Sequence, residues 1–387
     1  MILAHKIQLN PNNVQRTYFT KACGVARFAY NWALAQWNER YKAGEAVSES
    51  GLRKQLNAIK RETFPWMLEV TKCAPQLAIM DLGEAFKNFF AKRAGFPKFK
   101  KKGKSDRFSL SNDQFVVQNK TIRIPNLGYV RMTEGLRFAG KIMGATISRK
   151  ADRWYVSIQV EMPDPEHIHD SESQAVGVDL GVTDLAAFPD GTKLTGAKPH
   201  KALLSRLSRL NKSLSRKQGS KKGEKKSENF KKAQKQLSRL HARIANIRSD
   251  ETHKLTTMLT QNYGTIGIEN LNVSGMVKNH KLSRAILDMN FFEFRRQLEY
   301  KANMTGSIVV VAGRFFPSSK LCSACGEKIE SLKLSDREWT CPVCNSHHDR
   351  DTNAAINLKN NAVSYTVSAC GEFLGSLLCE AGIEHQI

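Results

Sequence analysis

Long apolar runs are absent from this 387-residue sequence, since nowhere do eighteen apolar residues follow one another. A helix that crosses a membrane needs about twenty. The first residues, "MILAHKIQLNPNN", also lack the charged segment, apolar stretch and small-residue cleavage site of a secretory signal. We therefore expect a cytoplasmic protein without a membrane partner.

Acidic residues are scarce relative to basic ones. The chain has 36 Asp and Glu against 60 Lys and Arg, which gives a formal net charge of +24 and a pI near 9.8. Such a charge attracts polyanions, and nucleic acid is the leading candidate once a membrane is set aside. The 41% content of hydrophobic residues is typical of a globular chain, long enough for two or three domains.

Hydrophobic periodicity divides the first half of the chain into blocks. Residues 1–10 alternate like a strand, residues 14–92 repeat apolar side chains at helical steps, and several short segments of strand character follow up to about residue 162. Closely spaced short strands favour a small barrel or sandwich. If the first strand pairs into it, the helical block is an insertion. The polar residues 163–174 predict a linker.

The second half indicates an α/β arrangement. "AVGVDLG" and "DLAAF" predict a hairpin, "YGTIGIENL" and "GSIVVVAGRFFPSS" predict buried strands, and "NFFEFRRQLEYKANMTG" predicts an amphipathic helix.

Residues 201–248 hold sixteen Lys or Arg and two acidic residues, with leucines and isoleucines at helical spacing. This pattern predicts a helical hairpin with a basic tip. A solvated charged face is the alternative, but such faces usually mix signs, so we expect contacts with phosphate. Candidate nucleic-acid contacts in this hairpin and in the earlier segment "FPKFKKK", whose alternative is a disordered basic loop, are Lys98, Lys100, Lys101, Lys102, Arg209, Lys212, Arg216 and Lys217.

Two C-x-x-C pairs form the most specific motif, with fifteen residues between them. Each pair fits a tight turn that directs two thiolates at one ion, and the intervening length allows a hairpin that closes a tetrahedral shell. We expect one structural zinc ion; a redox dithiol is the alternative, which two matched pairs disfavour. The expected ligands are Cys322, Cys325, Cys341 and Cys344. His347 and His348 are expected to face the surface or the substrate, and the scattered cysteines to be buried hydrophobic residues, namely Cys23, Cys73, Cys370 and Cys379.

Three carboxylates stand out by context. Asp179 interrupts the apolar "AVGVDLG", Glu269 ends "TIGIE", and Asp351 opens "DTNAAINL". Burial of an unpaired carboxylate among apolar neighbours costs several kcal/mol unless it binds a cation. The alternatives are strand ends that reach solvent for the first two, and a helix N-cap for the third.

Helical geometry adds a test for Asp351. If residues 351–358 are helical, Asp351 shares one face with small alanines that suit close packing on a sheet. Asp349 should then face elsewhere, and Arg350 is available for a phosphate. Three carboxylates at one end of a sheet can hold two Mg²⁺ ions about 3.5–4 Å apart, the arrangement that promotes hydrolysis at phosphorus. The combination predicts a nuclease.

The order of these motifs resembles the TnpB family, also called OrfB transposases, which small bacterial insertion sequences encode. "GVDLG", "GIENL", "SSKLCSACG", "WTCPVCN" and "DRDTNAAINL" carry the resemblance, and "FPKFKKK" and "RLNKSLSRKQGSKK" extend it over nearly the whole chain. It implies an α/β RNase H-like (RuvC) nuclease domain with an inserted basic helical hairpin and a four-cysteine zinc ribbon, plus an N-terminal β-barrel with an inserted helical domain.

The family's function supplies the remaining expectations. The resemblance implies RNA-guided cleavage of double-stranded DNA beside a short motif, with a noncoding guide RNA from the transposon end. One Mg²⁺-dependent centre of Asp179, Glu269 and Asp351 would cut the DNA, in a bacterial or archaeal cytoplasm and at the nucleoid. A monomer is favoured. The implied bounds are 1–10 with 96–165 for the barrel, 11–95 for the helical recognition domain, 172–318 with 346–387 for the nuclease, and 319–345 for the ribbon.

Three other functions share some of these features. A transposase would act directly on transposon ends without RNA, and a repressor would bind DNA with structural acids. A Holliday-junction resolvase shares the fold but has little use for the ribbon and the long N-terminal region.

Overall fold

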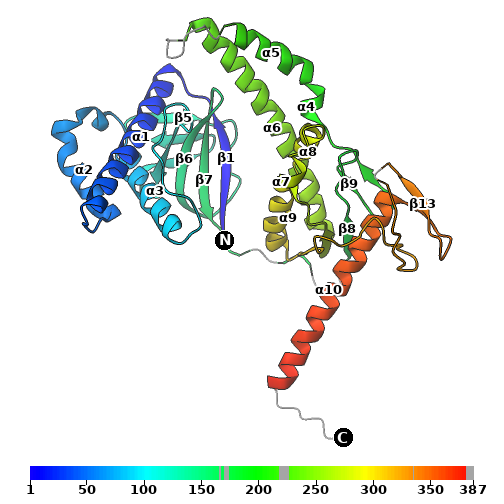
Figure 1. Cartoon of the computed structure of the whole chain (residues 1–387). Coiled ribbons are helices and arrows are strands. Elements are labelled where there is room, and N and C mark those ends of the chain that lie inside the picture. The colour runs from blue at the N-terminus through cyan, green and yellow to red at the C-terminus, as the bar shows by residue number, and fades with distance from the viewer. Residues whose placement is uncertain (165–166, 170–173, 218–225, 334, 381–387) are drawn as a thin grey trace. The chain divides into compact units, whose positions relative to one another are not determined.

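The chain folds into two compact units, residues Met1–Asp164 and Pro165–Ile387, each with a hydrophobic core of its own. A computed structural model describes the chain except residues 165–166, 170–173, 218–225, 334 and 381–387, and describes the side chains of the last helix up to residue 366 (Figure 1). Cys370 and Cys379 therefore lie outside the described side chains. Among the described residues, no helix is both long and apolar enough to cross a membrane.

In the first unit, strand β1 pairs antiparallel with β7 along its whole length, from Ile2 opposite Glu161 to Leu9 opposite Trp154. The expected pairing of the first strand with the later strands is therefore confirmed. The sheet order is β1-β7-β6-β2, and β3-β4-β5 form a second antiparallel sheet. The strands are β1 (Ile2–Leu9), β2 (Arg107–Ser111), β3 (Val116–Gln118), β4 (Thr121–Ile124), β5 (Gly128–Arg131), β6 (Lys141–Lys150) and β7 (Arg153–Glu161).

Helices fill the chain between β1 and β2, as the periodicity predicts. They are α1 (Asn13–Lys42), α2 (Glu49–Thr63), the 3₁₀ helix η1 (Pro65–Glu69) and α3 (Cys73–Phe90). A capping box fixes the start of α1, because the Asn12 side chain accepts from the Gln15 backbone and the Gln15 side chain accepts from the Asn12 backbone. Phe19 of α1 packs on Trp154 of the sheet, with ring centroids 5.1 Å apart.

The second unit contains a parallel sheet with β11 (Thr265–Ile268) between β8 (Ala175–Val178) and β12 (Ile308–Val311). The short hairpin of β9 (Ala186–Ala187) and β10 (Lys193–Leu194) continues this sheet, because Asp179 and Ala187 form an antiparallel bridge. The Asp179 backbone N–H donates to the Ala187 carbonyl at 3.1 Å, and the reverse bond is 2.9 Å. This single bridge joins the two-stranded sheet β10-β9 to the β8 edge of the three-stranded sheet β12-β11-β8.

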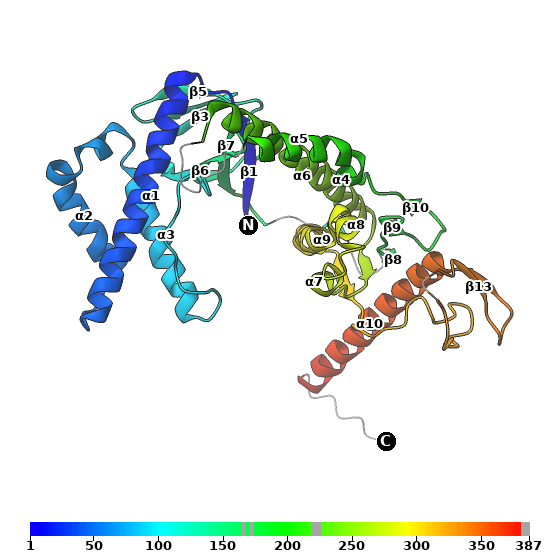
Figure 2. The same cartoon turned by 45° about the horizontal axis from the view of Figure 1, so that its top comes forward.

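Two helices form the arms of the predicted hairpin, and the second extends beyond residue 248. Most of the predicted basic tip, residues 218–225, lies outside the described residues. α5 (Leu204–Arg216) pairs with α6 (Glu228–Asn262), which remains one helix for 35 residues (Figure 2). Leu207, Leu240 and Ile244 form a small core between them. The further helices are α4 (Pro199–Ala202), α7 (Val273–Met276), α8 (Ser283–Met289), α9 (Phe291–Thr305) and α10 (Arg350–Glu380).

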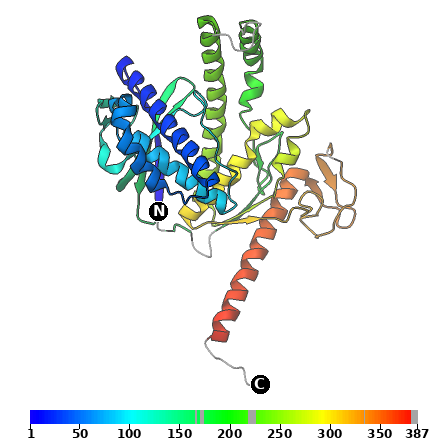
Figure 3. The same cartoon turned by 60° about the vertical axis from the view of Figure 1, so that its left-hand side comes forward.

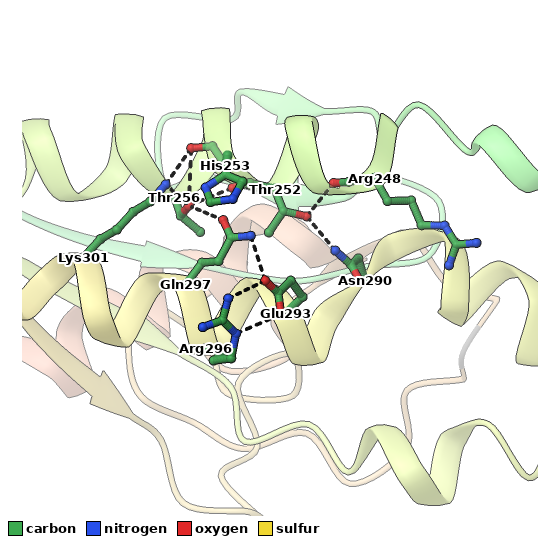
Figure 4. Close-up of polar contacts among 9 residues, drawn as sticks. All are labelled: Arg248, Thr252, His253, Thr256, Asn290, Glu293, Arg296, Gln297 and Lys301. Carbon is green, nitrogen blue, oxygen red and sulfur yellow. Dashed lines mark hydrogen bonds and ion pairs between the residues drawn. The ribbon is translucent and has the colours of Figure 1, made fainter. Parts of the chain in front are cut away.

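The last part of α6 continues its buried face with Leu255, Leu259 and threonines at positions 252, 256 and 260. This face meets α9 through polar side chains (Figure 4). Thr256 is fully buried, and its hydroxyl contacts the Gln297 side chain at 3.2 Å. Gln297 in turn donates to Glu293 at 3.0 Å, which Arg296 binds through two nitrogens at 2.6 and 2.9 Å. Lys301 of α9 also donates to the His253 carbonyl and the Thr256 hydroxyl at 2.8 and 2.7 Å. The bonds of Gln297 and Lys301 to α6 hold the two helices in one rotation.

Helix α10 lies directly on the backbone of β8 and β11 (Figure 3). Gly177 and Gly267 are register partners on these strands. A Cβ atom on Gly177 would lie 1.9 Å from the Ala355 carbonyl oxygen, and one on Gly267 would lie 2.3 Å from the Leu358 carbonyl oxygen. Ala355 and Leu358 are buried, so the predicted packing of this helix face on the sheet is confirmed.

We expect Gly177→Ala to destabilise the second unit by about 3 kcal/mol or more, because backbone atoms of α10 would have to move away from the sheet. Chemical denaturation followed by circular dichroism measures this change. Gly313→Ala is the matched control, since a Cβ there meets no atom within 4 Å. Equal stabilities of the two variants would show that α10 tolerates displacement.

Candidate functional site

Two of the three predicted acids lie at the same edge of the parallel sheet. Asp179 directly follows β8 and Glu269 directly follows β11, whose last residues, Val178 and Ile268, are register partners. Asp351 lies in the first turn of α10, the helix that crosses both strands. The structure therefore brings the carboxyl ends of two strands and the start of one helix together.

Asp179 is affected by its burial and by the charges of the two other carboxylates. Burial raises the pKa of Asp179 to about 8, and the negative charges of Glu269 and Asp351 act in the same direction. Arg350 and Lys193 lower it to a lesser extent. Without a bound cation, Asp179 is therefore held in its neutral form at pH values where an ordinary Asp is charged.

Glu269 is held by the turn that follows β12. The hydroxyl of the buried Ser318 donates a short hydrogen bond to Glu269 Oε1. This bond orients one carboxylate oxygen, while the Glu269 side chain also borders two surface hollows, one of about 260 Å³ and one of about 460 Å³.

Asp351 is paired with basic side chains. Its two oxygens lie 3.4 Å from Lys193 Nζ and 3.6 Å from Arg337 Nη1. Lys193 also donates to Asp349 Oδ2 at 2.7 Å. Burial opposes the charge of Lys193, but the bond to Asp349 and the charge of Asp351 together hold the pKa of Lys193 above its usual value.

The expectation that Asp349 faces elsewhere is wrong. Asp349 ends strand β14 (His347–Asp349) and precedes the helix, so the helical period does not place its side chain. Its Oδ1 atom accepts from the Thr352 backbone N–H at 2.9 Å. Asp349 therefore caps α10, which leaves Asp351 free of the N-cap role that was its alternative reading.

The carboxylates have the chemistry of a Mg²⁺ site, because hard cations take oxygen ligands. Burial and the charges of Glu269 and Asp351 raise the pKa of Asp179 despite Arg350 and Lys193, so the neighbouring basic groups compensate the carboxylates only in part. Lys193 and Arg337 now draw Asp351 to one side. Among the described residues, only the four cysteines form a group of at least three potential ligands that all lie within 4.8 Å of one another, so the carboxylates would have to turn toward a shared ion.

The four predicted cysteines do converge, with all sulfur atoms within 4.8 Å of one another. Cys322 Sγ lies 3.6 Å from Cys344 Sγ, and Cys325 Sγ lies 3.7 Å from Cys341 Sγ. Zn–S bonds of about 2.3 Å in a tetrahedron place sulfurs about 3.8 Å apart. The cluster is thus compatible with zinc, with β13 (Glu338–Thr340) and β14 pairing behind it.

Each cysteine pair ends in a residue with left-handed backbone, Gly326 at φ +79° and Asn345 at φ +58°. In both turns the N–H of this residue donates to the carbonyl of the first cysteine, at 2.9 and 3.0 Å. These residue types reach that conformation at low cost, so the sequence itself favours the two turns that direct the thiols inward.

His348 faces the cysteine cluster rather than the surface or the substrate, which corrects the expectation for it. Its Nε2 atom lies 3.1 Å from Cys322 Sγ, and its ring packs on Trp339. A contact of this kind can orient a thiolate ligand without replacing it. His347 is exposed, as expected.

Two buried asparagines join the ribbon to α10. Asn357 Nδ2 donates to the Ser318 and Leu321 carbonyls at 2.8 and 2.6 Å. Asn353, one turn earlier, donates to the Leu321 carbonyl at 2.7 Å and accepts from the Ser323 N–H at 2.9 Å. Hydrogen bonds therefore connect α10, which carries Asp351, to the segment between Ser318 and the first cysteine. Ser318 is the hydrogen-bond partner of Glu269.

The predicted nucleic-acid residues differ in their surroundings. Lys100 is a structural residue: its backbone bonds to the Asn31 side chain at 2.8 and 3.0 Å and its ammonium lies 3.6 Å from the centre of the Tyr30 ring. The Arg350 guanidinium donates to the Lys333 carbonyl at 3.1 Å. The others are exposed, namely Lys98, Lys101, Lys102, Arg209, Lys212, Arg216 and Lys217.

Several residues of the site escape sequence reasoning. Lys193 follows an ordinary turn, and Arg337 lies in a loop, so nothing marks either as a partner of Asp351. The asparagines do leave a signal, because two buried amides four residues apart on an otherwise apolar face imply specific hydrogen-bond partners.

Comparison with known proteins agrees with the motif order. The chain is 35% identical over 391 residues to "Putative RNA-guided DNA endonuclease InsQ" of Escherichia coli K12, with 96% of this chain and 95% of the relative covered. It is 36% identical over 382 residues to a protein of Streptomyces pristinaespiralis named "Putative RNA-guided DNA endonuclease", covering 95% and 91%. The chain belongs to the TnpB family.

Family models place the resemblance along the chain. Residues 157–280 match the OrfB model of IS605 elements, described as a probable transposase, and residues 291–358 match the Cas12f1-like TNB domain. Residues 1–46 match a model described as a helix-turn-helix domain; here they form β1 and the single helix α1. The solved structure of a Cas12f1–sgRNA–target DNA complex shares the fold, with a TM-score of 0.54, 14% identity, and coverage of 89% of this TnpB chain and 83% of that chain.

The raised pKa of Asp179 gives a prediction for stability without Mg²⁺. Its value rises from 3.8 to about 8 on folding, so the folded state binds the proton more tightly. Raising the pH from 5 to 8 should therefore destabilise the wild type more than Asp179→Asn, by about 2–4 kcal/mol. Thermal melts of the zinc-loaded protein in Mg²⁺-free buffers measure this, with the exposed Asp250→Asn as control. Parallel pH profiles for all three proteins would contradict the electrostatic account.

Proposed function

We propose that this TnpB chain is an RNA-guided DNA endonuclease encoded by a transposable element, which cuts DNA beside a short element-specific motif by Mg²⁺-dependent phosphodiester hydrolysis. The observation that carries the proposal is that Asp179 and Glu269 follow adjacent strands of one sheet, near Asp351 in the first turn of α10. Burial and the charges of Glu269 and Asp351 raise the pKa of Asp179. Carboxylates with a purely structural role would not need to lie so close together, because their repulsion destabilises the folded protein.

The strand order supports an RNase H-like layout for the second unit. An antiparallel hairpin, β9-β10, extends one edge of a parallel sheet, and the acids follow two adjacent strands of that sheet. We assign this nuclease domain to residues 172–318 and 346–387, with the ribbon at 319–345 inserted before α10. In the first unit, residues 1–10 and 96–165 would form the barrel-like domain and residues 11–95 the helical recognition domain.

The proposed mechanism assigns a task to each side chain. Asp179, Glu269 and Asp351 would hold two Mg²⁺ ions, which supply a nucleophilic water and stabilise charge at phosphorus when bound. Ser318 keeps one oxygen of Glu269 in a fixed direction. Lys193 and Arg337, now bound to Asp351, become available to phosphate oxygens once that carboxylate turns to a metal ion.

Zinc would have a structural role in this scheme. Four thiolates fill a tetrahedral shell, so no position is left for water or substrate. The exposed basic residues of α5 and α6 and of the "FPKFKKK" segment would contact the nucleic-acid backbone. Base pairing with the guide RNA would read most of the target sequence. We place the active protein in the cytoplasm, bound to the nucleoid, as a monomer.

The decisive experiment expresses the chain with its flanking DNA, purifies it and sequences the RNA that it retains. A plasmid that matches the 3′ end of this RNA is then incubated with the complex, with and without Mg²⁺. We expect cleavage only of the matching plasmid and only with Mg²⁺. Purified protein without RNA that joins transposon ends would instead establish a direct transposase.

Replacement of the proposed ligands separates a nuclease from a repressor. Asp179→Ala and Asp351→Ala should each lower the cleavage rate by more than roughly 100-fold, because loss of a residue that only orients a metal ligand already costs about 10–100-fold. Both variants should still retain the RNA. Gel electrophoresis of the plasmid measures the rate. The exposed Asp250→Ala is the control. Wild-type cleavage by either variant would refute the assignment, and a wild type that binds target DNA without cutting it would favour the repressor.

We expect Cys344→Ser to lose zinc and to cut DNA roughly tenfold more slowly or worse, because the ribbon then no longer holds the loop that Asn353 and Asn357 fasten to α10. Metal analysis by mass spectrometry gives the zinc content. Val343→Ala, an exposed residue in the same turn, should retain both zinc and activity. Normal cleavage by a zinc-free Cys344→Ser would show that the ribbon does not position Asp351.

A further inference from the structure

An exposed phenylalanine stands beside the carboxylate cluster. Phe315 is 91% exposed, although it lies in an ordered turn in which the Phe316 N–H donates to the Gly313 carbonyl at 2.9 Å. This turn also contains the segment that leads to Ser318, the partner of Glu269. A large apolar ring held in water by a fixed backbone is unfavourable unless a partner covers it.

A second exposed ring lies on α9. Phe292 is 73% exposed and shares one helix face with Arg295, Arg296 and Glu299, at steps of three, four and seven residues. All four line the hollow of about 460 Å³. On another face of α9, Gln297 and Lys301 bond to Thr256 of α6 at 3.2 and 2.7 Å (Figure 4), so the face with Phe292 is turned away from α6.

Both hollows share Glu269, Leu271 and Asn272 in their walls. The smaller one adds Arg314 and Phe315, with the Arg314 guanidinium 5.9 Å from the ring centre of Phe315. Arg295 is paired with Glu299, and Arg296 with Glu293. Arg314 has no such ion pair among the described residues and adds an uncompensated positive charge next to the exposed ring.

We propose that these two hollows form one groove for an unpaired DNA strand, in which bases stack on Phe315 and Phe292 and Arg314 binds a phosphate. Aromatic rings beside a cation are the usual means of binding single strands without sequence preference. The groove passes Glu269, so the bound strand reaches the carboxylates. The proposal rests on the proposed function for the identity of the strand, but the binding itself requires neither cleavage nor a guide.

Binding is measured in the Asp179→Asn background, so that no strand is cut. The probe is a fluorescein-labelled DNA of about twelve deoxythymidines, at roughly 0.2 M salt to suppress non-specific phosphate binding. We expect Phe315→Ala to weaken its affinity about tenfold, Phe292→Ala to act in the same direction, and Phe315→Trp to restore binding. Tyr365→Ala, another exposed aromatic in the second unit, is the matched control and should bind normally.

A second probe reports stacking directly. A single 2-aminopurine in the same strand should lose fluorescence on binding, and Phe315→Ala should abolish that loss. Affinity and fluorescence equal to those of Tyr365→Ala would overturn the proposal. So would a defect seen only with the RNA of the same sequence, or a dimer in sedimentation experiments that Phe315→Ala dissolves. If the fluorescence loss depends on Phe315 but the wild-type complex never cuts the matching plasmid, the single-strand groove is supported and the proposed endonuclease activity is refuted.

Discussion

The direct contact between α10 and the strands beneath it is the constraint on which the site depends. Side chains usually separate a helix from a sheet, but Gly177 and Gly267 let α10 approach the backbone itself. A helix seated on backbone has little freedom to shift, because peptide groups cannot change rotamer. Asp351, in its first turn, is therefore placed relative to Asp179 and Glu269 by main-chain geometry.

The carboxylates are held together against their own repulsion, and the basic groups around them only partly compensate. The pKa of Asp179 is raised, while Asp351 forms ion pairs with Lys193 and Arg337. Such a site lowers the stability of the metal-free chain, a common property of functional centres. The hydrophobic core of the second unit offsets this cost, together with the packed glycine face and the buried asparagine contacts.

The sequence was sufficient for the elements and for the cysteine and acidic motifs, since each has a strong local pattern. The apolar runs that end at Asp179 and Glu269 predicted that these acids lie at one edge of a sheet. The alanines of "DTNAAINL" predicted the helix face that packs on the sheet. The direction of the Asp349 side chain was predicted wrongly because α10 begins at Arg350. The helical period therefore does not apply to Asp349. Tertiary contacts between distant segments determine the roles of His348, Lys193 and Arg337. Such contacts cannot be predicted from the spacing of residues in the sequence. α6 extends past its expected end, and Leu255 and Leu259 continue its buried face beside the threonines.

Helix α6 also determines how far the second unit reaches. Its 35 residues extend about 50 Å at 1.5 Å per residue, with basic residues near its start and the contacts to α9 near its end. Because the helix is continuous, it has no joint at which the two ends could move independently. The hairpin therefore acts as a rigid spacer whose direction is set at the α9 interface, where hydrogen bonds and the core that contains Leu255 and Leu259 together hold the two helices.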